Sequence, residues 1–385
     1  MTSVHPKYRT GALVLLGTLV ATPLACGGSD EAATQPSSAA GTPDGSNDAL
    51  PPTDSNGTSD VSNYVDLPTK PGVYRSTCDG SGGVALDGDH FLAASDEDQV
   101  LRVYRRGADG PPLGTVDVST SIGVATNDEA DIEDLVRVGN RVYGMTSHGR
   151  NSKGELGRER YRFFGIDLMG TAPNLTTIGS GFTDKLLSQM LQAENWATPD
   201  AEVIARLTQA AKLSDDKDAD LAPEVDGLNI EGLTALPTAG RLGIGFRNPA
   251  IGEKAILVTL LNPDEVLTGK SARFGEAIRL DLGGLRVRAM AFSKVHGAVL
   301  VVGGAKDPGT TFRLFKWSGA PGVAPVAIED ITGPTSASPE GIVIYDNTKD
   351  VQILFDEGDK NVKGAACKDA APGDQSFTDV IVRVD

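Results

Sequence analysis

Residues 229–247 read NIEGLTALPTAGRLGIGFR, and this stretch decides the fold because the chain repeats it. It combines a short apolar strand that begins beside a glutamate, a tight turn, and a second apolar strand that ends in a charged residue. Residues 131–148 read DIEDLVRVGNRVYGMTSH and residues 338–356 read SPEGIVIYDNTKDVQILFD, which is the same pattern. Two looser copies lie at residues 84–96 and 286–303. Such internal similarity indicates an architecture of equivalent units.

Each hairpin is followed by a third predicted strand, and four of the units contain a fourth strand with an apolar-acidic-apolar sequence or a close variant. The third strands are predicted at residues 100–104, 161–167, 255–260, 311–317 and 378–384, and the fourth at 115–118, 174–178, 279–282 and 328–331. Four-stranded units at a spacing of roughly 50 residues are typical of a β-propeller. We therefore predict an all-β fold, a β-propeller of five four-stranded blades over residues 63–385. A sixth blade between the second and third repeats is the alternative.

The fifth unit reaches Asp385 before a fourth strand appears, but residues 64–67, which read YVDL, carry the fourth-strand signature ahead of the first unit. We predict that this N-terminal strand completes the last blade and closes the ring, because closure removes a free sheet edge. Cys78 and Cys367 lie at opposite ends of the globular part. A disulfide between them would lock the closure, and two unpaired thiols are the alternative.

Residues 183–213 interrupt the repeats and have a helical pattern. Leu186, Leu187 and Met190 share one face of a first helix, and Thr198-Pro199 predicts a second helix that begins with a capping residue followed by proline. We therefore predict an inserted helical hairpin. It is either a decoration packed against the propeller or a lid or partner surface.

The N-terminal part of the chain predicts export. Lys7 and Arg9 precede an apolar run that is too short to span a membrane, and the run ends directly before Cys26 in the manner of a bacterial lipoprotein signal. We predict that residues 1–25 are a signal peptide and that residues 26–62 are a lipidated cysteine and a disordered tether of small and polar residues. The domain is then anchored in the bacterial cell envelope, at the outer membrane, in the periplasm or at the cell surface. Simple secretion is the alternative.

The chain carries a net charge of −17, which argues against nucleic acid and anionic lipid surfaces as partners because both need a basic face. The sequence contains no phosphate-binding loop, no serine-nucleophile elbow and no zinc-protease helix. His90 and His296 fall in turns on the opposite face from His148, which argues against a three-histidine zinc site.

Charged residues recur at equivalent inner positions of the repeats. In a propeller the start of the innermost strand and the end of the second strand lie on the same face, because the two strands are antiparallel. The charged or polar residues at these positions, including those two places earlier on the inner strand, are Asp96, Asp131, Glu133, His148, Asn229, Glu231, Arg247, Arg286, Arg288, Glu340 and Asp356. We expect them to line one mouth of the central channel.

Three interpretations of this charged mouth are open. It is a structural ion-pair network, a cation site, or a small-molecule site. A cation would be Ca²⁺, because carboxylate and amide oxygens are hard ligands. The candidate metal ligands are Asp131, Glu133, Asn229, Glu231, Glu340 and Asp356. In a small-molecule site, Arg247 and Arg286 clamp an anionic group, while Glu133 and His148 supply acid–base chemistry.

The same motifs resemble those of a bacterial family, the domain-of-unknown-function 3616 family, over about residues 80–360. The resemblance rests on SDE at residues 95–97, DIEDL at 131–135, SH at 147–148, NIEGL at 229–233, FRNP at 246–249, PEGI at 339–342 and DEG at 356–358. It implies a propeller-like fold and no assigned activity. A looser similarity, at the level of fold alone, links the chain to phytase-like and esterase-like β-propellers, which use calcium and acidic side chains at a channel mouth.

Two functions of different classes follow from these patterns. The first is a non-catalytic envelope module that binds a small anionic ligand or an envelope protein. The second is a calcium-assisted phosphoesterase or similar hydrolase that acts on an anionic substrate, since hydrolysis needs an activated water. The sequence contains no recognised nucleophile and no complete metal shell, so the binding module is our prediction and enzymatic activity stays open. We expect Glu133, Glu231, Glu340 and Asp356 to hold a cation or polar ligand and Arg247 and His148 to contact it, with Arg286 and Arg288 as further candidate ligand-binding residues.

Overall fold

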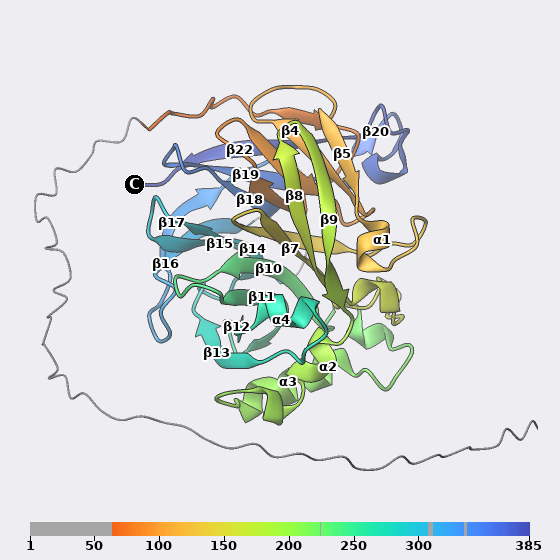
Figure 1. Ribbon diagram of the computed structural model, residues 1–385, viewed down its shortest axis with the longest axis vertical. Coiled ribbons are helices and arrows are strands. Elements are labelled where there is room, and N and C mark those ends of the chain that lie inside the picture. The colour runs from red at the N-terminus through yellow and green to blue at the C-terminus, as the bar shows by residue number, and fades with distance from the viewer. Residues whose placement is uncertain (1–63, 224, 307–310, 335–336) are drawn as a thin grey trace, which may run out of the picture. The chain divides into compact units, whose positions relative to one another are not determined.

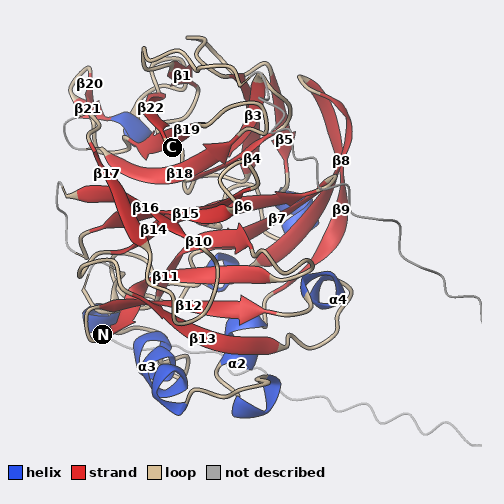
Figure 2. Cartoon of the chain, turned by 90° about the vertical axis from the view of Figure 1, so that its left-hand side faces the viewer, coloured by secondary structure: helices blue, strands red, loops and turns tan. Residues whose placement is uncertain are grey.

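The computed structural model describes residues 64–223, 225–306, 311–334 and 337–385, which belong to one unit of the chain, Ser59–Asp385. The predicted signal peptide, Cys26 and the predicted tether lie outside the described residues. Strands dominate the described part (Figure 2). Its helices are too short or too polar to cross a membrane.

Twenty of the described strands form five antiparallel four-stranded sheets, here called blades 1 to 5 (Figure 1). From the inner to the outer strand, blade 1 contains β2 (Gly82–Ala85), β3 (His90–Ala94), β4 (Val100–Arg105) and β5 (Gly114–Asp117). Blade 2 contains β6 (Ile132–Val138), β7 (Arg141–Thr146), β8 (Phe163–Thr171) and β9 (Asn174–Thr183). Blade 3 contains β10 (Asn229–Ala235), β11 (Leu242–Ile251), β12 (Lys254–Leu260) and β13 (Phe274–Leu280). Blade 4 contains β14 (Arg286–Ser293), β15 (Ala298–Gly304), β16 (Phe312–Trp317) and β17 (Val326–Ile331). Blade 5 contains β18 (Ser338–Ile344), β19 (Asp350–Asp356), β22 (Ser376–Arg383) and β1 (Val73–Arg75).

The five blades form a closed ring. The inner strands contact one another in the order β2, β6, β10, β14 and β18, and β18 contacts β2 again. The predicted five-bladed β-propeller is therefore confirmed, and there is no sixth blade among the described sheets. Apolar side chains that alternate along the strands fill the space between neighbouring blades. Leu92 and Leu101 of blade 1, for example, share one buried cluster with Val142 and Ile166 of blade 2, and each such side chain stabilises the fold by about 1.5–3 kcal/mol.

An N-terminal strand completes blade 5, as predicted, but the predicted segment was wrong. The closing strand is β1, which pairs antiparallel with β22, and not residues 64–67. Tyr74 of β1 is fully buried, and its hydroxyl donates a hydrogen bond to Asp379 at 2.8 Å. Leu67 is also buried, yet its N–H donates to the side chain of Asp350 at 2.6 Å and not to the backbone of a strand. Residues 64–67 therefore cover blade 5 without extending its sheet.

A disulfide between Cys78 and Cys367 joins the two ends of the propeller, as predicted. Their Cα atoms are 5.8 Å apart, and both side chains are buried. Cys78 follows β1, and Cys367 belongs to an insert between β19 and β22. The insert contains the small hairpin of β20 (Asn361–Val362) and β21 (Ala365–Ala366) and the turn η4 (Cys367–Asp369). The bond therefore fastens this insert to the seam of the ring.

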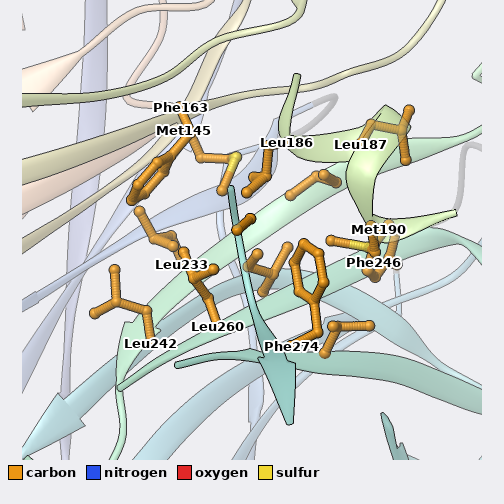
Figure 3. Packing of buried hydrophobic residues seen from close by; sticks show 14 of the residues in the cluster. Met145, Phe163, Leu186, Leu187, Met190, Leu233, Leu242, Phe246, Leu260 and Phe274 are labelled. Carbon is orange, nitrogen blue, oxygen red and sulfur yellow. The ribbon is translucent and has the colours of Figure 1, made fainter. Parts of the chain in front are cut away.

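The predicted helical hairpin is present between β9 and β10. It consists of α2 (Leu186–Met190) and α3 (Ala201–Ala211) with the turn η2 (Ala193–Asn195) between them. The cap of α3 is Asp200, whose carboxylate accepts the N–H of Val203 at 3.1 Å, and not Thr198 as predicted. Figure 3 shows Leu186, Leu187 and Met190 within the apolar cluster that also contains Phe246 and Phe274 of blade 3. The hairpin is therefore packed against the propeller. The other helical elements are α1 (Ser119–Ile122), η1 (Arg158–Arg160), η3 (Ala219–Leu221) and α4 (Pro263–Leu267).

The inner strands approach one another closely at the ring axis. A Cβ atom on Gly82 would lie 2.8 Å from the Cα atom of Asp134, so only glycine fits there. Asp134 is itself fully enclosed, and its carboxyl accepts the N–H groups of Leu135 at 2.8 Å and Leu233 at 2.7 Å. Burial raises the pKa of Asp134, while these amides lower it. One carboxyl group thus ties the inner strands of blades 2 and 3 together at the axis.

Candidate functional site

Four inner strands carry a β-bulge at the same position. The bulged residues, which the cross-strand pairing skips, are Glu133, Glu231, Arg288 and Glu340. A bulge re-aims its side chain and leaves the flanking residues in register. The residue after each bulge is Asp134, Gly232, Ala289 or Gly341, so in three of the four strands a small residue faces the crowded axis. The four positions that are equivalent in the sequence repeats therefore also have the same local backbone structure.

These bulged side chains belong to a group of buried and half-buried charges at one end of the inner strands, which we call the axial cluster. It contains Asp79, Asp96, Asp131, Glu133, Glu231, Glu340 and Asp356 together with Arg160, Arg247 and Arg288. Each member lies within electrostatic range of others from a different blade. Seven carboxyl groups and three guanidinium groups thus meet at the axis. Carboxyl groups therefore outnumber guanidinium groups among the described residues of the cluster.

The three arginines form ion pairs with one half of the cluster. Glu231 is at the centre of this half and is only 2 % exposed. Arg247 lies 2.9 Å from Glu231 Oε1, and Arg288 lies 3.2 Å from Glu231 Oε2 and also pairs with Glu340. Asn229 adds a hydrogen bond from its amide to Glu231 at 2.8 Å. This arginine-paired half matches the interpretation of the charges as a structural ion-pair network.

Arg160, on η1, supplies the third ion pair. Its guanidinium contacts Asp131, at the start of β6, and also Glu129. Burial raises the pKa of Asp131 to about 6 although Arg160 lowers it. Burial likewise raises the pKa of Glu340 to about 8, against the opposing effect of Arg288. Asp131 and Glu340, although each pairs with an arginine, are therefore held closer to neutrality than carboxyl groups in water.

The other half of the cluster lacks arginine. Asp79 lies between β1 and β2, Asp96 follows β3, and Asp356 ends β19, so blades 1 and 5 supply all three. Asp79 is 2 % exposed and accepts a hydrogen bond from Ser95 at 3.3 Å. Burial and the nearby Asp356 carboxyl, to which it is hydrogen-bonded, raise the pKa of Asp79 to about 9. Asp79 was not among the residues that we expected to line the mouth.

Glu133 has no hydrogen-bond or ion-pair partner in the part of the chain that the structure describes, although it is only 8 % exposed. Its pKa is raised first by burial and then by Asp131, Glu231, Glu340 and Asp96. Because these four carboxyl groups come from blades 1, 2, 3 and 5, Glu133 points into the middle of the cluster. A buried carboxylate without a partner is costly, so this position calls for a cation or a proton.

Two expected members of the site lie apart from it. The His148 ring is buried, with Nδ1 2.8 Å from the carbonyl oxygen of Thr146 and the ring edge against Tyr161. Burial lowers its pKa to about 4, and it makes no contact with a cluster carboxyl among the described residues. Arg286 binds backbone carbonyls, such as that of Gly284 at 2.9 Å. The acid–base role expected of His148 and the anion clamp expected of Arg286 therefore have no geometric support among the described residues.

A separate surface hollow lies beside the helical insert. It is lined by Trp196 and Phe274 and by charged residues that include Glu265 and Lys270. Lys270 already pairs with Glu265 at 2.9 Å. We therefore place the candidate site at the axial cluster, where buried charge is left without a partner.

Comparisons with known proteins add little beyond the ring itself. No protein-family model and no curated protein matches the chain, so the family resemblance stays a prediction. Among solved structures, the chain is similar to a chain of the mitotic checkpoint complex, with 8 % identity and a TM-score of 0.31, covering 79 % of this chain and 63 % of that one. It is also similar to Raptor of Chaetomium thermophilum, with 9 % identity and a TM-score of 0.31, covering 74 % and 20 %. A third is the Cps50 (Swd1) β-propeller domain of Myceliophteria thermophila, with 7 % identity and a TM-score of 0.29, covering 78 % and 83 %. The chain thus spans less than two thirds of the first two, and likenesses this weak carry no argument about ligand, partner or activity.

Proposed function

We propose that this protein is a non-catalytic binding module whose ligand site is the axial cluster and whose ligand carries positive charge. The observation that supports the proposal is the excess of buried carboxyl groups over guanidinium groups in the cluster. Without a ligand these groups must hold protons or remain as buried charges, and both states are less favourable than ionised carboxylates that share a cation. A cation therefore binds to the folded chain and stabilises it.

A bare anionic ligand does not fit this site as well. The guanidinium groups of Arg160, Arg247 and Arg288 are already paired with cluster carboxylates. An anion would have to displace these carboxylates while it entered a region of negative potential. An anionic molecule would therefore need a bound cation between itself and the protein. The alternative of a hydrolase needs in addition a poised base, and His148 does not supply one from its position beside Thr146.

The proposal also includes the location of the protein, which is the cell envelope. We propose that Cys26 is lipidated and that residues 26–62 tether the propeller to a membrane, on the sequence pattern alone. The test is fractionation of cells that express the wild-type chain or Cys26→Ala. The wild-type protein is expected in the membrane fraction and the variant in the soluble exported fraction. Wild-type protein in the soluble fraction would refute the anchor and leave secretion.

Thermal unfolding of the purified chain tests the cation site. The protein is stripped with chelator and then melted alone, with CaCl₂, with MgCl₂ and with spermidine. A cation that binds only the folded state adds about 2.7 kcal/mol at about 100 times its dissociation constant, which raises the Tm by several degrees. We expect at least one cation to raise the Tm of the wild-type protein.

Glu133→Gln is the diagnostic variant, and Glu329→Gln is its matched control because Glu329 is exposed on the outer strand β17. Glu133→Gln removes an unpartnered buried carboxyl, so it should melt above the wild type in chelator and respond less to cations. Glu329→Gln should behave as the wild type in both respects. If none of the three cations raises the Tm of the wild-type protein, the axial cluster is a structural network and the proposal is wrong.

A further inference from the structure

The axial cluster is divided by charge into two halves with different chemical character. Every arginine of the cluster pairs with Asp131, Glu231 or Glu340. Among the described residues, no lysine, arginine or histidine forms an ion pair with Asp79, Asp96 or Asp356. Three of the six metal ligands expected from the sequence are thus already neutralised by arginine, whereas the arginine-free half is open to a cation.

The geometry of the arginine-free half fits a single small ion. Asp79, Asp96 and Glu97 each offer one carboxylate oxygen, and these oxygens all lie within 4.8 Å of one another. A calcium ion binds oxygens at about 2.3–2.6 Å, so two of its ligands lie up to about 5 Å apart. One ion can therefore contact all three carboxylates. Asp356 lies beside them, since a Cβ atom on Gly358 would be 3.0 Å from Asp79 Oδ1 and 3.1 Å from Asp356 Oδ1.

Unpartnered oxygens at the same place point independently to a ligand. Asp96 Oδ1 is buried and has no hydrogen-bond partner. Glu133, which is 8 % exposed and has no partner among the described residues, lies within electrostatic range of Asp131, Glu231 and Glu340 and, more weakly, of Asp96. Buried polar atoms in folded proteins are nearly always satisfied, and an exception calls for a bound water or ion. The orphaned atom of the arginine-free half, Asp96 Oδ1, is a carboxylate oxygen, so an ion satisfies it and a water molecule does so only in part.

A lysine stands at the rim of this half. The Lys368 ammonium lies 3.4 Å from Glu97, and Lys368 directly follows Cys367, so the disulfide holds it in place. Its side chain is 43 % exposed, in contrast to the enclosed Asp79. Lys368 therefore acts as a weak internal competitor that partly neutralises the site and can swing into solvent when an ion binds.

We infer that Asp79, Asp96 and Glu97 are the protein ligands of one divalent metal ion of the calcium class, and that the ion displaces Lys368 from Glu97. This inference rests on the proposed function and deepens it, because it names the cation and moves it from the predicted ring to blades 1 and 5. Calcium is preferred because the donors are all oxygen and because it accepts irregular shells completed by water. The site contains no cysteine or histidine that would favour zinc.

Calorimetric titration of the chelator-stripped full chain with CaCl₂ tests the inference. Asp96→Asn should weaken calcium binding at least about tenfold, because the charge count of the ligands sets calcium affinity. Lys368→Met should strengthen it several-fold, because it removes the competing ammonium. Glu329→Gln is the control, since Glu329 is exposed on the outer strand β17 of blade 4, and it should leave the affinity unchanged.

Each other outcome overturns the inference in a distinct way. If Glu231→Gln abolishes calcium binding while Asp96→Asn does not, the ion lies in the arginine-paired half. If spermidine raises the Tm but CaCl₂ gives no binding heat, the proposed cation-binding function stands and the metal site fails. If no cation binds, both fail. Should Asp96→Asn not fold, as judged by its melt in chelator, Glu97→Gln replaces it, because Glu97 is more exposed and tolerates substitution.

Discussion

The ion pairs of Arg288 predict a large and pH-dependent stability effect. Arg288 is 4 % exposed, and its guanidinium lies between Glu231 and Glu340. Arg288→Met keeps much of the side-chain length and removes the charge, so two buried carboxyl groups lose a counter-ion at once. Removing one partner of a buried ion pair costs about 3–5 kcal/mol. For a domain of this size such a loss lowers the Tm by about 10 °C.

The effect should grow with pH. The native-state pKa of Glu340 is about 8 in the presence of Arg288, which lowers it, so in Arg288→Met it lies higher still. A carboxyl whose pKa is raised by folding stabilises the native state below its unfolded value, near 4.3, and this contribution is lost as the pH rises through the native value. Up to about pH 8 both proteins lose this contribution in parallel, and above it only the variant goes on losing it, so the variant should be closest to the wild type at pH 6 and furthest from it at pH 9.

Urea unfolding at both pH values measures the effect, and Arg286→Met is the control. Arg286 lies two residues away on β14, is half-buried and binds only backbone carbonyls, so its loss should cost about 1 kcal/mol without a marked pH dependence. The double variant Arg288→Met, Glu340→Gln should recover part of the loss, since it removes one of the two orphaned charges. If Arg288→Met costs no more than Arg286→Met at pH 9, the argument from buried ion pairs is refuted.

Three further predictions concern buried groups outside the ion pairs. Burial lowers the pKa of His148 from 6.5 to about 4, so the wild-type protein should lose up to about 3 kcal/mol between pH 6.5 and pH 4. His148→Asn, which suits the left-handed backbone there, should flatten that part of the urea-derived stability curve, and parallel curves would contradict this. Asp134→Ala should cost about 2–4 kcal/mol in urea unfolding, because it leaves two buried backbone N–H groups unpaired, and a cost under about 1 kcal/mol would speak against the axial role. Replacing Cys78 and Cys367 by alanine should cost about 5 kcal/mol by loop entropy, given the 289-residue separation, and an unchanged melting temperature would show that the seam holds without the bond.

The ring was predictable from the sequence because two strands joined by a tight turn pair with each other, so the hairpin repeats identify the hydrogen-bonded neighbours directly. The closing strand was not predictable, since residues 64–67 have the fourth-strand sequence pattern but do not form a strand. Leu67 is indeed buried, but Tyr64 and Val65 are exposed, and the Leu67 N–H binds the Asp350 side chain and not the backbone of a strand. An apolar-acidic-apolar pattern therefore identifies neither the hydrogen-bond partner of a segment nor the burial of each of its apolar residues. The true closing strand, β1, is only three residues long and contains a single fully buried side chain, Tyr74.

The candidate site was predictable in part for a related reason. Repeat spacing placed Glu133 and Glu231 correctly, because a bulge at the same position in each blade keeps the backbone equivalent. Spacing does not fix the direction of a side chain, and the left-handed backbone of His148, with φ of 51°, turns its ring away. Asp79 was missed because blade 1 has no glutamate repeat to mark it. Asp134 was visible in the repeats as an acid where two equivalent positions have glycine, and only the packing at the axis explains it.

The pairing of β1 with β22 also sets an order of events for folding. Val73 pairs with Thr378, so the two sides of the seam are separated by most of the domain. Blades 1 to 4 consist of consecutive strands and can form from local hairpins, whereas blade 5 has to wait for the last strand. Contacts between residues so distant in sequence form slowly, and a chain that lacks its final strand keeps the outer edge of blade 5 open to other chains. We therefore expect the seam to close last during folding and to be the first place where the native ring opens.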